Sequence, residues 1–470
     1  MIKTKKIDFW IPVSLGILVL YVLFMLYPIL KVITQSVRDN TTGAFTLGYF
    51  KQFFSDPYYF ITLFNSFKIS ICVTIICLII GVPLAYLYNV YEIKGRQLLQ
   101  ILIVLTSMSA PFIGAYSWIL LLGRSGLITK FLKSAFNIVM PNIYGFKGIL
   151  LVLSTKLFSL VFLYVSGALK NVDNSLLEAS ANMGRTGWRR FLTIVLPLCM
   201  PSILAAALMV FMRSLADFGT PLLIGEGYRT FPVEIYNQYV GETSINHSFA
   251  AAISVIAILI TLIVFLFQKY LSNRTSFSMS ALHRIERKKP RLAASIAIHI
   301  YAYGLVIVSL LPQVYLVFLS FRNTTKTGNM FRSGYSLMSY RQVFGTMGGA
   351  IWNTVKICGG ALVIVVVLAI LISYLVVRRY NIINNIIDTL SMVPYIIPGS
   401  VVGIAMVMAF NKGPLVLTGT AMIMVIAMCI RRIPYTIRSS VAVLGQIPIS
   451  VEEAAISLGA GKTKTLVRIT

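Results

Sequence analysis

Charged residues are scarce in this chain: they make up 12% of its 470 residues, against about 25% in an average soluble domain. Hydrophobic residues make up 57%, and the mean hydropathy is +0.84. The apolar residues also form long runs, and residues 357–377 contain no charge. Because about 20 helical residues span the ~30 Å core of a bilayer, this run crosses it. The composition excludes an ordinary soluble domain and predicts an all-α, polytopic membrane protein.

Histidine and cysteine are also few, with three and five residues. All the cysteines lie in or beside apolar runs, where cysteine behaves as a small hydrophobic residue. The histidines, His247, His283 and His299, lie in separate regions. The sequence therefore predicts no disulfide framework, metal site or cofactor, and it offers no nucleophile–base pair to an enzyme.

Acidic residues are the rarest charged class, with 14 Asp and Glu against 41 Lys and Arg, a net charge of +27. In a soluble protein such an excess suggests nucleic acid. In a membrane protein, however, basic residues collect in cytoplasmic loops beside anionic lipid. We therefore predict the bilayer, and no nucleic acid, as the partner of these charges.

The apolar runs predict a series of membrane helices with the N-terminus in the cytoplasm. The chain begins with a basic flank and an apolar run without a small-residue cleavage site, which indicates a retained signal anchor. Under this orientation the inner loops carry more Lys and Arg than the outer loops. The predicted spans lie near 9–33, 61–89, 98–122, 148–169, 198–218, 249–269, 295–320, 352–377, 386–410 and 415–437.

A polar and basic segment, 271–293, has the composition of a cytoplasmic linker and divides the chain into halves, 1–270 and 294–470. The halves resemble each other: Asn65-Ser66-Phe67-Lys68 matches Asn353-Thr354-Val355-Lys356, and residues 169–184 match 444–459. An even number of spans separates equivalent points, so the two copies face the same way. This favours a parallel repeat over the inverted repeats of several secondary transporters.

Each half carries one motif in a predicted inner loop, 170–197 in the first half and 438–470 in the second. It predicts a short helix, a glycine turn and a second helix. The spacing Ser-x-x-Glu predicts a capping box at the start of each short helix, and the glycine can adopt the left-handed conformation that ends it. A proline then begins the next helix in the first copy. The motif residues are Ser175, Glu178, Ala179, Ser180, Gly184 and Pro197, and Ser450, Glu453, Ala454, Ala455 and Gly459.

The pattern E-A-A, three residues, G, nine residues, I-x-L-P resembles the conserved loop of permease subunits in binding-protein-dependent ABC importers. The resemblance covers nearly the whole chain and departs in the first copy only at Ser180. It implies a type I ABC importer permease fold in the bacterial plasma membrane, with an extracytoplasmic binding protein as partner. In that family the loop forms a coupling helix that receives the movement of two cytoplasmic ATPase subunits. The alternative, that each glutamate only caps its helix, stays open.

Residues 215–239 look like the ferric-iron permease subfamily, although thiamine, polyamine and phosphonate permeases share the architecture. Gly459 to Thr463 invites a phosphate-loop interpretation, but the loop's first glycine would fall at Ile456, after a predicted helix. ATP hydrolysis is therefore expected from a separate subunit. The second copy has only about four predicted spans, so we expect the chain to be a C-terminally truncated form.

Ionisable residues inside predicted spans are candidates for the translocation pathway. Lys68, Lys156 and Lys356 lie near the outer ends of spans, where snorkelling also explains them. Arg213 and Asp217 are four residues apart, so on one helix face they would neutralise each other or line the pathway. Because inner-facing lysines repel a bare ferric ion, the ion passes with an anion or the substrate is itself anionic. An ion-driven secondary transporter would need a mid-bilayer acid, for which Asp217 and Asp388 are the candidates.

Overall fold

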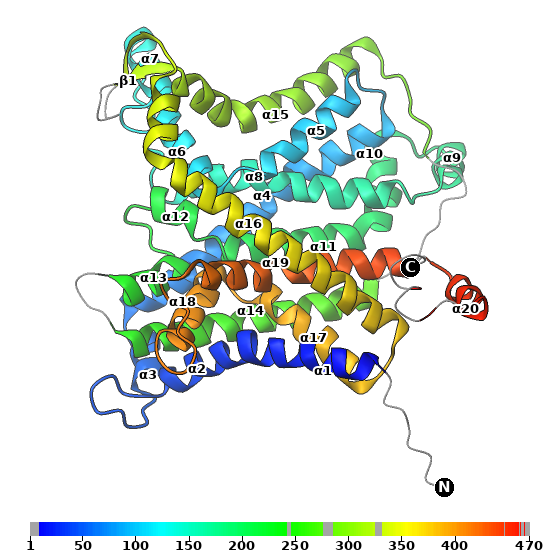
Figure 1. Cartoon of the computed structure of the whole chain (residues 1–470). Coiled ribbons are helices and arrows are strands. Elements are labelled where there is room, and N and C mark those ends of the chain that lie inside the picture. The colour runs from blue at the N-terminus through cyan, green and yellow to red at the C-terminus, as the bar shows by residue number, and fades with distance from the viewer. Residues whose placement is uncertain are drawn as a thin grey trace. The chain divides into compact units, whose positions relative to one another are not determined.

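The computed structural model describes residues 9–241, 246–275, 285–324, 331–445, 447–459, 461 and 465. The described chain is almost entirely helical, apart from one antiparallel hairpin of β1 (Arg322–Thr324) and β2 (Phe331–Tyr335) (Figure 1). It divides into two compact units. Unit 1 comprises 1–50, 241–259 and 344–470, and unit 2 comprises 51–240 and 260–343. The fold is thus all-α, as the composition predicts.

Unit 2 contains most of the helices of the first sequence half. Three helices, α3 (Gly48–Ser55), α14 (His247–Thr275) and α16 (Met338–Arg378), each cross a boundary between the units. The helices inside unit 2 are α4 (Pro57–Val90), α5 (Arg96–Ser107), α6 (Pro111–Leu122), α7 (Leu127–Phe136), α8 (Phe146–Leu169), α9 (Asn174–Asn182), α10 (Gly187–Arg190), the π-helix η2 (Phe191–Val195), α11 (Leu196–Leu215), α12 (Gly219–Ile224), α13 (Phe231–Val240) and α15 (Leu292–Ser320).

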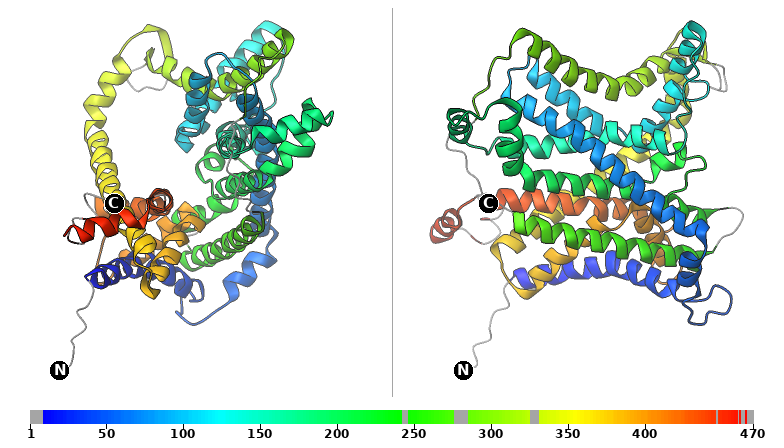
Figure 2. Two further views of the ribbon diagram at one scale, coloured as in Figure 1. Left: turned by 90° about the vertical axis from the view of Figure 1, so that its right-hand side faces the viewer. Right: turned by 180° about the vertical axis from the view of Figure 1, so that it is seen from behind.

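The core of unit 2 forms where α4, α8 and α11 pack side by side (Figures 1 and 2). The backbones of α4 and α8 approach closely at Gly81, where a Cβ atom would lie 2.7 Å from Cβ of Val161. Small residues allow such approaches between membrane helices. Further along, Asn89 Nδ2 donates to Ser166 Oγ at 2.8 Å across the same interface. This hydrogen bond satisfies a polar side chain that would otherwise be costly to bury.

Unit 1 contains the first helical run of the chain together with the helices of the second half. The run consists of α1 (Trp10–Tyr21), the π-helix η1 (Val22–Leu26) and α2 (Tyr27–Ser36). The π-turn precedes Pro28, a residue that removes a helical hydrogen bond and crowds the preceding turn. The other helices are most of α16, with α17 (Ile382–Ile396), α18 (Gly399–Phe410), α19 (Ala421–Leu444) and α20 (Ile449–Ser457).

Each unit combines the first helix of one sequence half with helices of the other half. In unit 1, α1 packs on α17 and α2 packs on α18, and Ser14 Oγ donates to Asn384 Oδ1 at 2.7 Å. In unit 2, α15 packs on α5 and α6, and Tyr301 OH donates to the carbonyl oxygen of Ile80 at 2.8 Å. The compact units therefore cut across the halves, and the division at 271–293 stays a prediction. Within that segment α14 continues to Thr275, and residues 276–284 lie outside the described residues.

Eight helical runs of the described residues are long and apolar enough to cross a membrane, or nine if the broken pair α17–α18 forms one span. The sequence predicts ten. The predicted span 98–122 is broken before Pro111 into α5 and α6, and the run counted there is shifted to Phe112–Phe136. The predicted span 386–410 corresponds to the broken pair α17–α18, which is not among the eight. The predicted span 415–437 falls in α19, which is not among the eight and which carries Arg431, Arg432 and Arg438.

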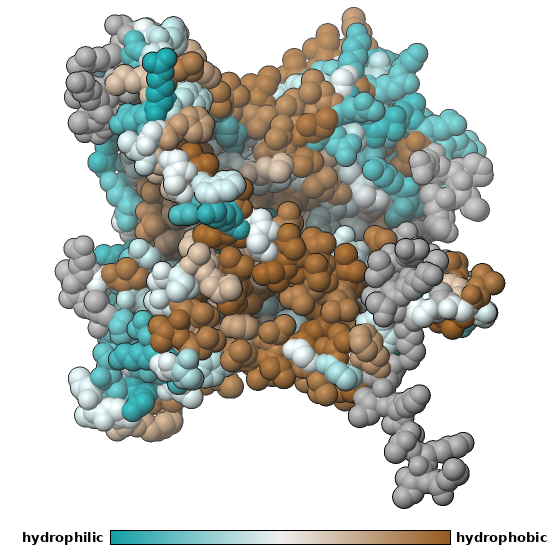
Figure 3. All heavy atoms as spheres, in the orientation of Figure 1, coloured by the Kyte–Doolittle hydropathy of each residue, from teal (hydrophilic) through white to brown (hydrophobic). Residues whose placement is uncertain are grey.

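The exposed surface fits a bilayer. On the face shown in Figure 3, each unit presents hydrophobic side chains along the middle of its helices, and hydrophilic side chains gather toward the helix ends. Large apolar residues on several of the long helices are exposed: Ile79, Ile263 and Val363 have 66%, 65% and 63% of their surfaces exposed. Apolar side chains of this kind are stable against lipid and unfavourable in water.

Candidate coupling helices and charged residues of the spans

The first motif forms α9, a helix of nine residues that follows the end of α8. Its N-cap is Asp173, whose Oδ1 accepts a hydrogen bond from the backbone N–H of Ser175 at 3.0 Å. The predicted capping box at Ser175 is therefore wrong, because an aspartate two residues earlier takes the capping position. Glu178 Oε1 instead accepts from Asn174 Nδ2 at 2.7 Å. The alternative role of Glu178 as a backbone cap has no support in this geometry.

The second motif forms α20, also of nine residues, after a turn that follows α19. Its N-cap is Pro448, so no side chain caps the helix, and Ser450 lies exposed in the first turn. The predicted capping box at Ser450 is wrong as well. The proline fixes φ at the residue from which the helix starts, but it has no side-chain acceptor for the first N–H groups of α20.

The two short helices present the same kind of face. Glu178 and Ala179 are exposed on α9, as are Glu453 and Ala454 on α20. The next residue of each motif, Ser180 or Ala455, is buried. Each helix therefore rests on its unit by one side and presents a glutamate and an alanine on the other. A narrow face of this kind can enter a groove on a partner.

The predicted glycine turns are confirmed. Gly184 has φ +78° and Gly459 has φ +87°, in the left-handed region that favours glycine. In the first copy, Ser180 Oγ donates to the carbonyl oxygen of Arg185 at 3.1 Å and so closes the turn. This hydrogen bond gives a structural role to the one residue that departs from the motif. In the second copy, Ala455 occupies the corresponding buried position.

Pro197 lies in the first turn of α11, as predicted, but it does not start a helix from a loop. The chain is already helical from Gly187, through α10 and η2. As at Pro28, a π-turn precedes the proline, and Leu196 N–H bonds to the carbonyl oxygen of Phe191. The phosphate-loop interpretation fails in its described part, because the residues before Gly459 form α20 and not a strand. Residues 460, 462–464 and 466–470 lie outside the described residues.

Among the predicted pathway residues, Lys68 and Lys356 occupy equivalent positions in the two copies and behave alike. Both are exposed, and each ammonium group lies over an aromatic ring. Lys68 Nζ is 5.0 Å from the ring centre of Phe146, and Lys356 Nζ is 5.5 Å from that of Trp352. Such contacts stabilise a cation without any substrate, which supports the snorkelling interpretation.

Arg213 and Asp217 do not share a helix face, because α11 ends at Leu215. Asp217 lies beyond that end, and its Oδ1 accepts from the backbone N–H of Thr220 at 2.9 Å at the start of α12. The predicted i, i+4 pairing on one helix is therefore wrong. The structure instead brings Lys156 of α8 within electrostatic reach of both residues. No spacing in the sequence predicts this group of three charges.

Lys156 also lines the polar cavity of unit 2, whose volume is about 20 Å³, enough for roughly one water molecule. Thr220 is fully buried there, and its hydroxyl has no hydrogen-bond partner. The cavity is too small for a large solute and is polar enough to hold water or a small ion. Its polar lining consists of Thr106, Ser109, Thr155, Lys156, Thr220, Ser309 and Gln313.

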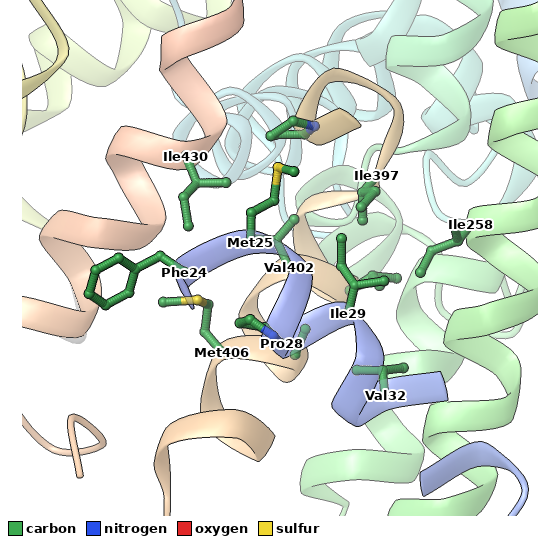
Figure 4. A pocket seen from close by; sticks show the side chains of 13 residues that line it. Phe24, Met25, Pro28, Ile29, Val32, Ile258, Ile397, Val402, Met406 and Ile430 are labelled. Atoms are coloured by element: carbon green, nitrogen blue, oxygen red, sulfur yellow. The ribbon is translucent and has the colours of Figure 1, made fainter. Parts of the chain in front are cut away.

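The cavities of unit 1 are apolar. One, of about 20 Å³, lies where η1 meets α18 and is lined by aliphatic, aromatic and thioether side chains such as Phe24, Met25 and Met406 (Figure 4). Another, of about 420 Å³, lies between α1, α16 and α19 and has an almost wholly apolar lining. Neither could hold a hydrophilic solute, since apolar cavities stay dry. Among the described residues, no group of three or more His, Cys, Asp or Glu side chains could hold a metal ion.

Asp388, the other candidate acid for an ion-driven transporter, forms an ion pair in which its Oδ1 lies 3.1 Å from Arg438 Nη2. The pair joins α17 to α19, two helices that also pack against each other. A carboxylate neutralised in this way has a structural role, so the geometry gives no support to proton or sodium coupling at Asp388.

These observations define a polytopic all-α membrane protein with two similar short helices, α9 and α20. The family of binding-protein-dependent transport system inner membrane components matches residues 77–277 and 365–470. The chain therefore belongs to this family, the permease subunits of ABC importers.

Several permeases of known systems are similar to this chain. The ferric transport system permease protein FbpB of Actinobacillus pleuropneumoniae is 27% identical over 97% of this chain and 67% of its own length. The spermidine/putrescine permease PotB of Haemophilus influenzae is 30% identical, over 53% of this chain and 89% of its own length. The molybdenum permease ModB of the same organism is 29% identical, over 45% of this chain and 93% of its own length.

The cap of α9 gives a first prediction. In the Asp173→Ala variant we expect amide hydrogen exchange across residues 174–182 to quicken about fivefold, because losing an N-cap costs about 1 kcal/mol. Mass spectrometry of the purified protein measures this exchange. Ser175→Ala is the matched control and should leave the rate unchanged. Equal acceleration in both variants would restore Ser175 as the capping residue.

Proposed function

We propose that this permease carries ferric iron from an extracytoplasmic binding protein into the cytoplasm. In this proposal, two separate ATPase subunits supply the energy and the chain itself is not catalytic. The coupling role rests on one feature that α9 and α20 share. In each helix one side is buried against the unit, and the motif glutamate and alanine are exposed on the other side. Two exposed helices of the same build suit two copies of one ATPase.

The length over which this chain is similar to a ferric permease favours iron over other solutes. The ferric permease is similar along almost the whole of this chain, whereas the polyamine and molybdenum permeases match about half of it. A chain with two copies of the unit supplies both halves of a pathway by itself. Residues 215–239, in which the sequence resembles ferric permeases, include Asp217 and the α12–α13 region.

The same proposal orients the chain. If α9 faces the cytoplasm, so does the C-terminal end of α8, which lies four residues before it. The C-terminal end of α4 lies beside α9 as well, because Lys288 N–H bonds to the carbonyl oxygen of Val90 and Glu286 N–H bonds to Asn174 Oδ1. The run α1–α2 and helix α4 are two consecutive candidate spans. The N-terminus is then cytoplasmic, in the orientation that the basic loops favour.

For the pathway we propose the charged group of Lys156, Arg213 and Asp217, with Lys68 and Lys356 as exposed cations at equivalent points of the two copies. Lys156 and Asp217 are half-buried and Arg213 is exposed. An ionisable residue in a span is expensive and is retained mainly for function. Asp217 is the acid of this group and would lower the repulsion that Lys156 and Arg213 exert on a cation. Its Oδ1 also accepts the backbone N–H of Thr220 in the first turn of α12.

The coupling role predicts the behaviour of variants in the short helices. In vesicles with the two ATPase subunits and the binding protein, Gly184→Pro and the pair Glu178→Gln with Glu453→Gln should keep ATP hydrolysis while uptake falls at least about tenfold. Proline cannot adopt the left-handed turn that Gly184 requires, and loss of the two exposed carboxylates weakens the contact with the ATPases. Glu226→Gln, an exposed acid between α12 and α13, is the matched control. Normal uptake in the motif variants would remove the coupling role.

The identity of the solute can be read from stimulation of ATP hydrolysis. We expect the binding protein to stimulate the reconstituted complex when it carries ferric iron. It should not do so when it is empty or carries spermidine, molybdate, thiamine or a phosphonate. Titration of each solute, with hydrolysis as the readout, compares them directly. Stimulation by a phosphonate alone would assign an anionic substrate and contradict the iron proposal.

The pathway assignment predicts that Asp217→Asn slows iron uptake about tenfold, the effect of about 1.4 kcal/mol in the barrier. The side-chain oxygen of asparagine can still accept the Thr220 N–H, so the variant removes the charge and keeps the fold. Asp56→Asn is the matched control, because the Asp56 carboxylate also accepts a backbone N–H at a helix start, that of Tyr58 in α4 at 2.9 Å. If both variants transport iron at the normal rate, Asp217 does not lie on the path.

A further inference from the structure

One buried guanidinium group joins three helix ends in unit 1. Arg378 is the last residue of α16, and its Nε donates to Glu452 Oε1 of α20 at 2.6 Å. Its Nη2 donates to the carbonyl oxygen of Leu444, the last residue of α19, at 3.3 Å, and to that of Ile447 at 2.7 Å. Only 6% of the Arg378 side chain and 9% of the Glu452 side chain are exposed. The ends of α16 and α19 and the start of α20 thus meet at one side chain.

The first copy has no such ion pair at the equivalent positions. Counting equally far from Asn65 and Asn353 leads to Val90 and Arg378, and counting back from the motif glutamates leads to Leu177 and Glu452. Val90 and Leu177 are both buried in the apolar core of unit 2. At these equivalent positions, the first copy therefore has buried apolar side chains where the second has an ion pair.

A buried ion pair is a costly way to seat a helix. Removing two charges from water costs several kcal/mol per ion, and well-packed apolar residues often stabilise a fold equally well. The ion pair also fixes the orientation of α20 relative to α16, because the planar guanidinium group sets the angles as well as the distances of its hydrogen bonds. An apolar contact fixes neither the angle nor the distance between the groups. At this point α9 is therefore free to shift against its neighbours, while α20 is held to α16.

We propose that Arg378 and Glu452 form the link through which movement of α20 reaches α16 and α19, with Arg378 as a positioning residue. This inference rests on the proposed role of α20 as a coupling helix. In the transport cycle, α20 and the end of α16 then move as one body. In the first copy, movement passes through an apolar contact that holds its short helix less rigidly. The two ATPase subunits therefore move the two halves of the permease to different extents.

The link can be tested by measuring a distance within unit 1. Spin labels replace Tyr380, just after α16, and Leu458, just after α20, which are 85% and 89% exposed. The five native cysteines are replaced, and the chain is reconstituted with its ATPase subunits and binding protein in lipid nanodiscs. With the link intact we expect one narrow distance distribution that does not change when ATP binds. In Glu452→Gln the distribution should broaden or shift with ATP.

Transport provides the second readout. Glu452→Gln should reduce uptake per ATP hydrolysed about tenfold, within the usual range of coupling between sites. Arg378→Lys keeps the charge and loses the planar fork, so an intermediate loss is expected. The double variant Arg378→Leu with Glu452→Leu leaves no unpaired charge and should assemble normally, yet it should show the broad distribution. Arg438→Ala, which breaks the Arg438–Asp388 pair away from α20, is the control and should behave as the parent protein.

Two outcomes separate failure of this inference from failure of the proposed function. If Gly459→Pro uncouples transport while Glu452→Gln and the double leucine variant keep the narrow distribution and normal uptake, the link is wrong and α20 still couples. If Gly459→Pro also leaves uptake per ATP unchanged, α20 is not a coupling helix and both proposals fall.

Discussion

The bilayer requires every backbone polar group inside it to find a partner within the protein, and it makes unpaired side-chain polar groups costly. Serine and threonine hydroxyls on α4 return their hydrogen bonds to carbonyl oxygens of the preceding turn, as Ser66, Ser70 and Thr74 show. Asn89 finds Ser166 on α8. The long helices can therefore be apolar outside and weakly polar at their contacts. A structure of this kind has few places where an external force can act.

The two short helices are such places. They lie outside the apolar runs, each with one buried side and one exposed side, and each is joined by a short turn to the preceding long helix. The first helix of each sequence half also packs with the other half: α1 packs with helices of the second half, and α15 packs with helices of the first.

Much of the architecture could be predicted from the sequence because it depends on local signals. Runs of apolar residues predict the long helices, and a glycine at a fixed distance from Glu178 or Glu453 predicts a left-handed turn. The errors come from competition and from tertiary contacts. Asp173 and Pro448 stand closer to the helix starts than the serines that the capping pattern favours. Arginines in α19 weaken a span that looks apolar at its beginning. The grouping of Lys156 with Asp217 and the Arg378–Glu452 pair join residues far apart in sequence, so no spacing could reveal them.

If α9 and α20 are both coupling helices, they lie on the same side of the membrane. Single cysteines at positions 178 and 453, in a cysteine-free chain in sealed vesicles of known orientation, test it most directly with an impermeant thiol reagent. The account predicts that both positions react from the cytoplasmic side only, and that bound ATPase subunits protect both. Reaction of the two positions from opposite sides of the membrane would contradict it.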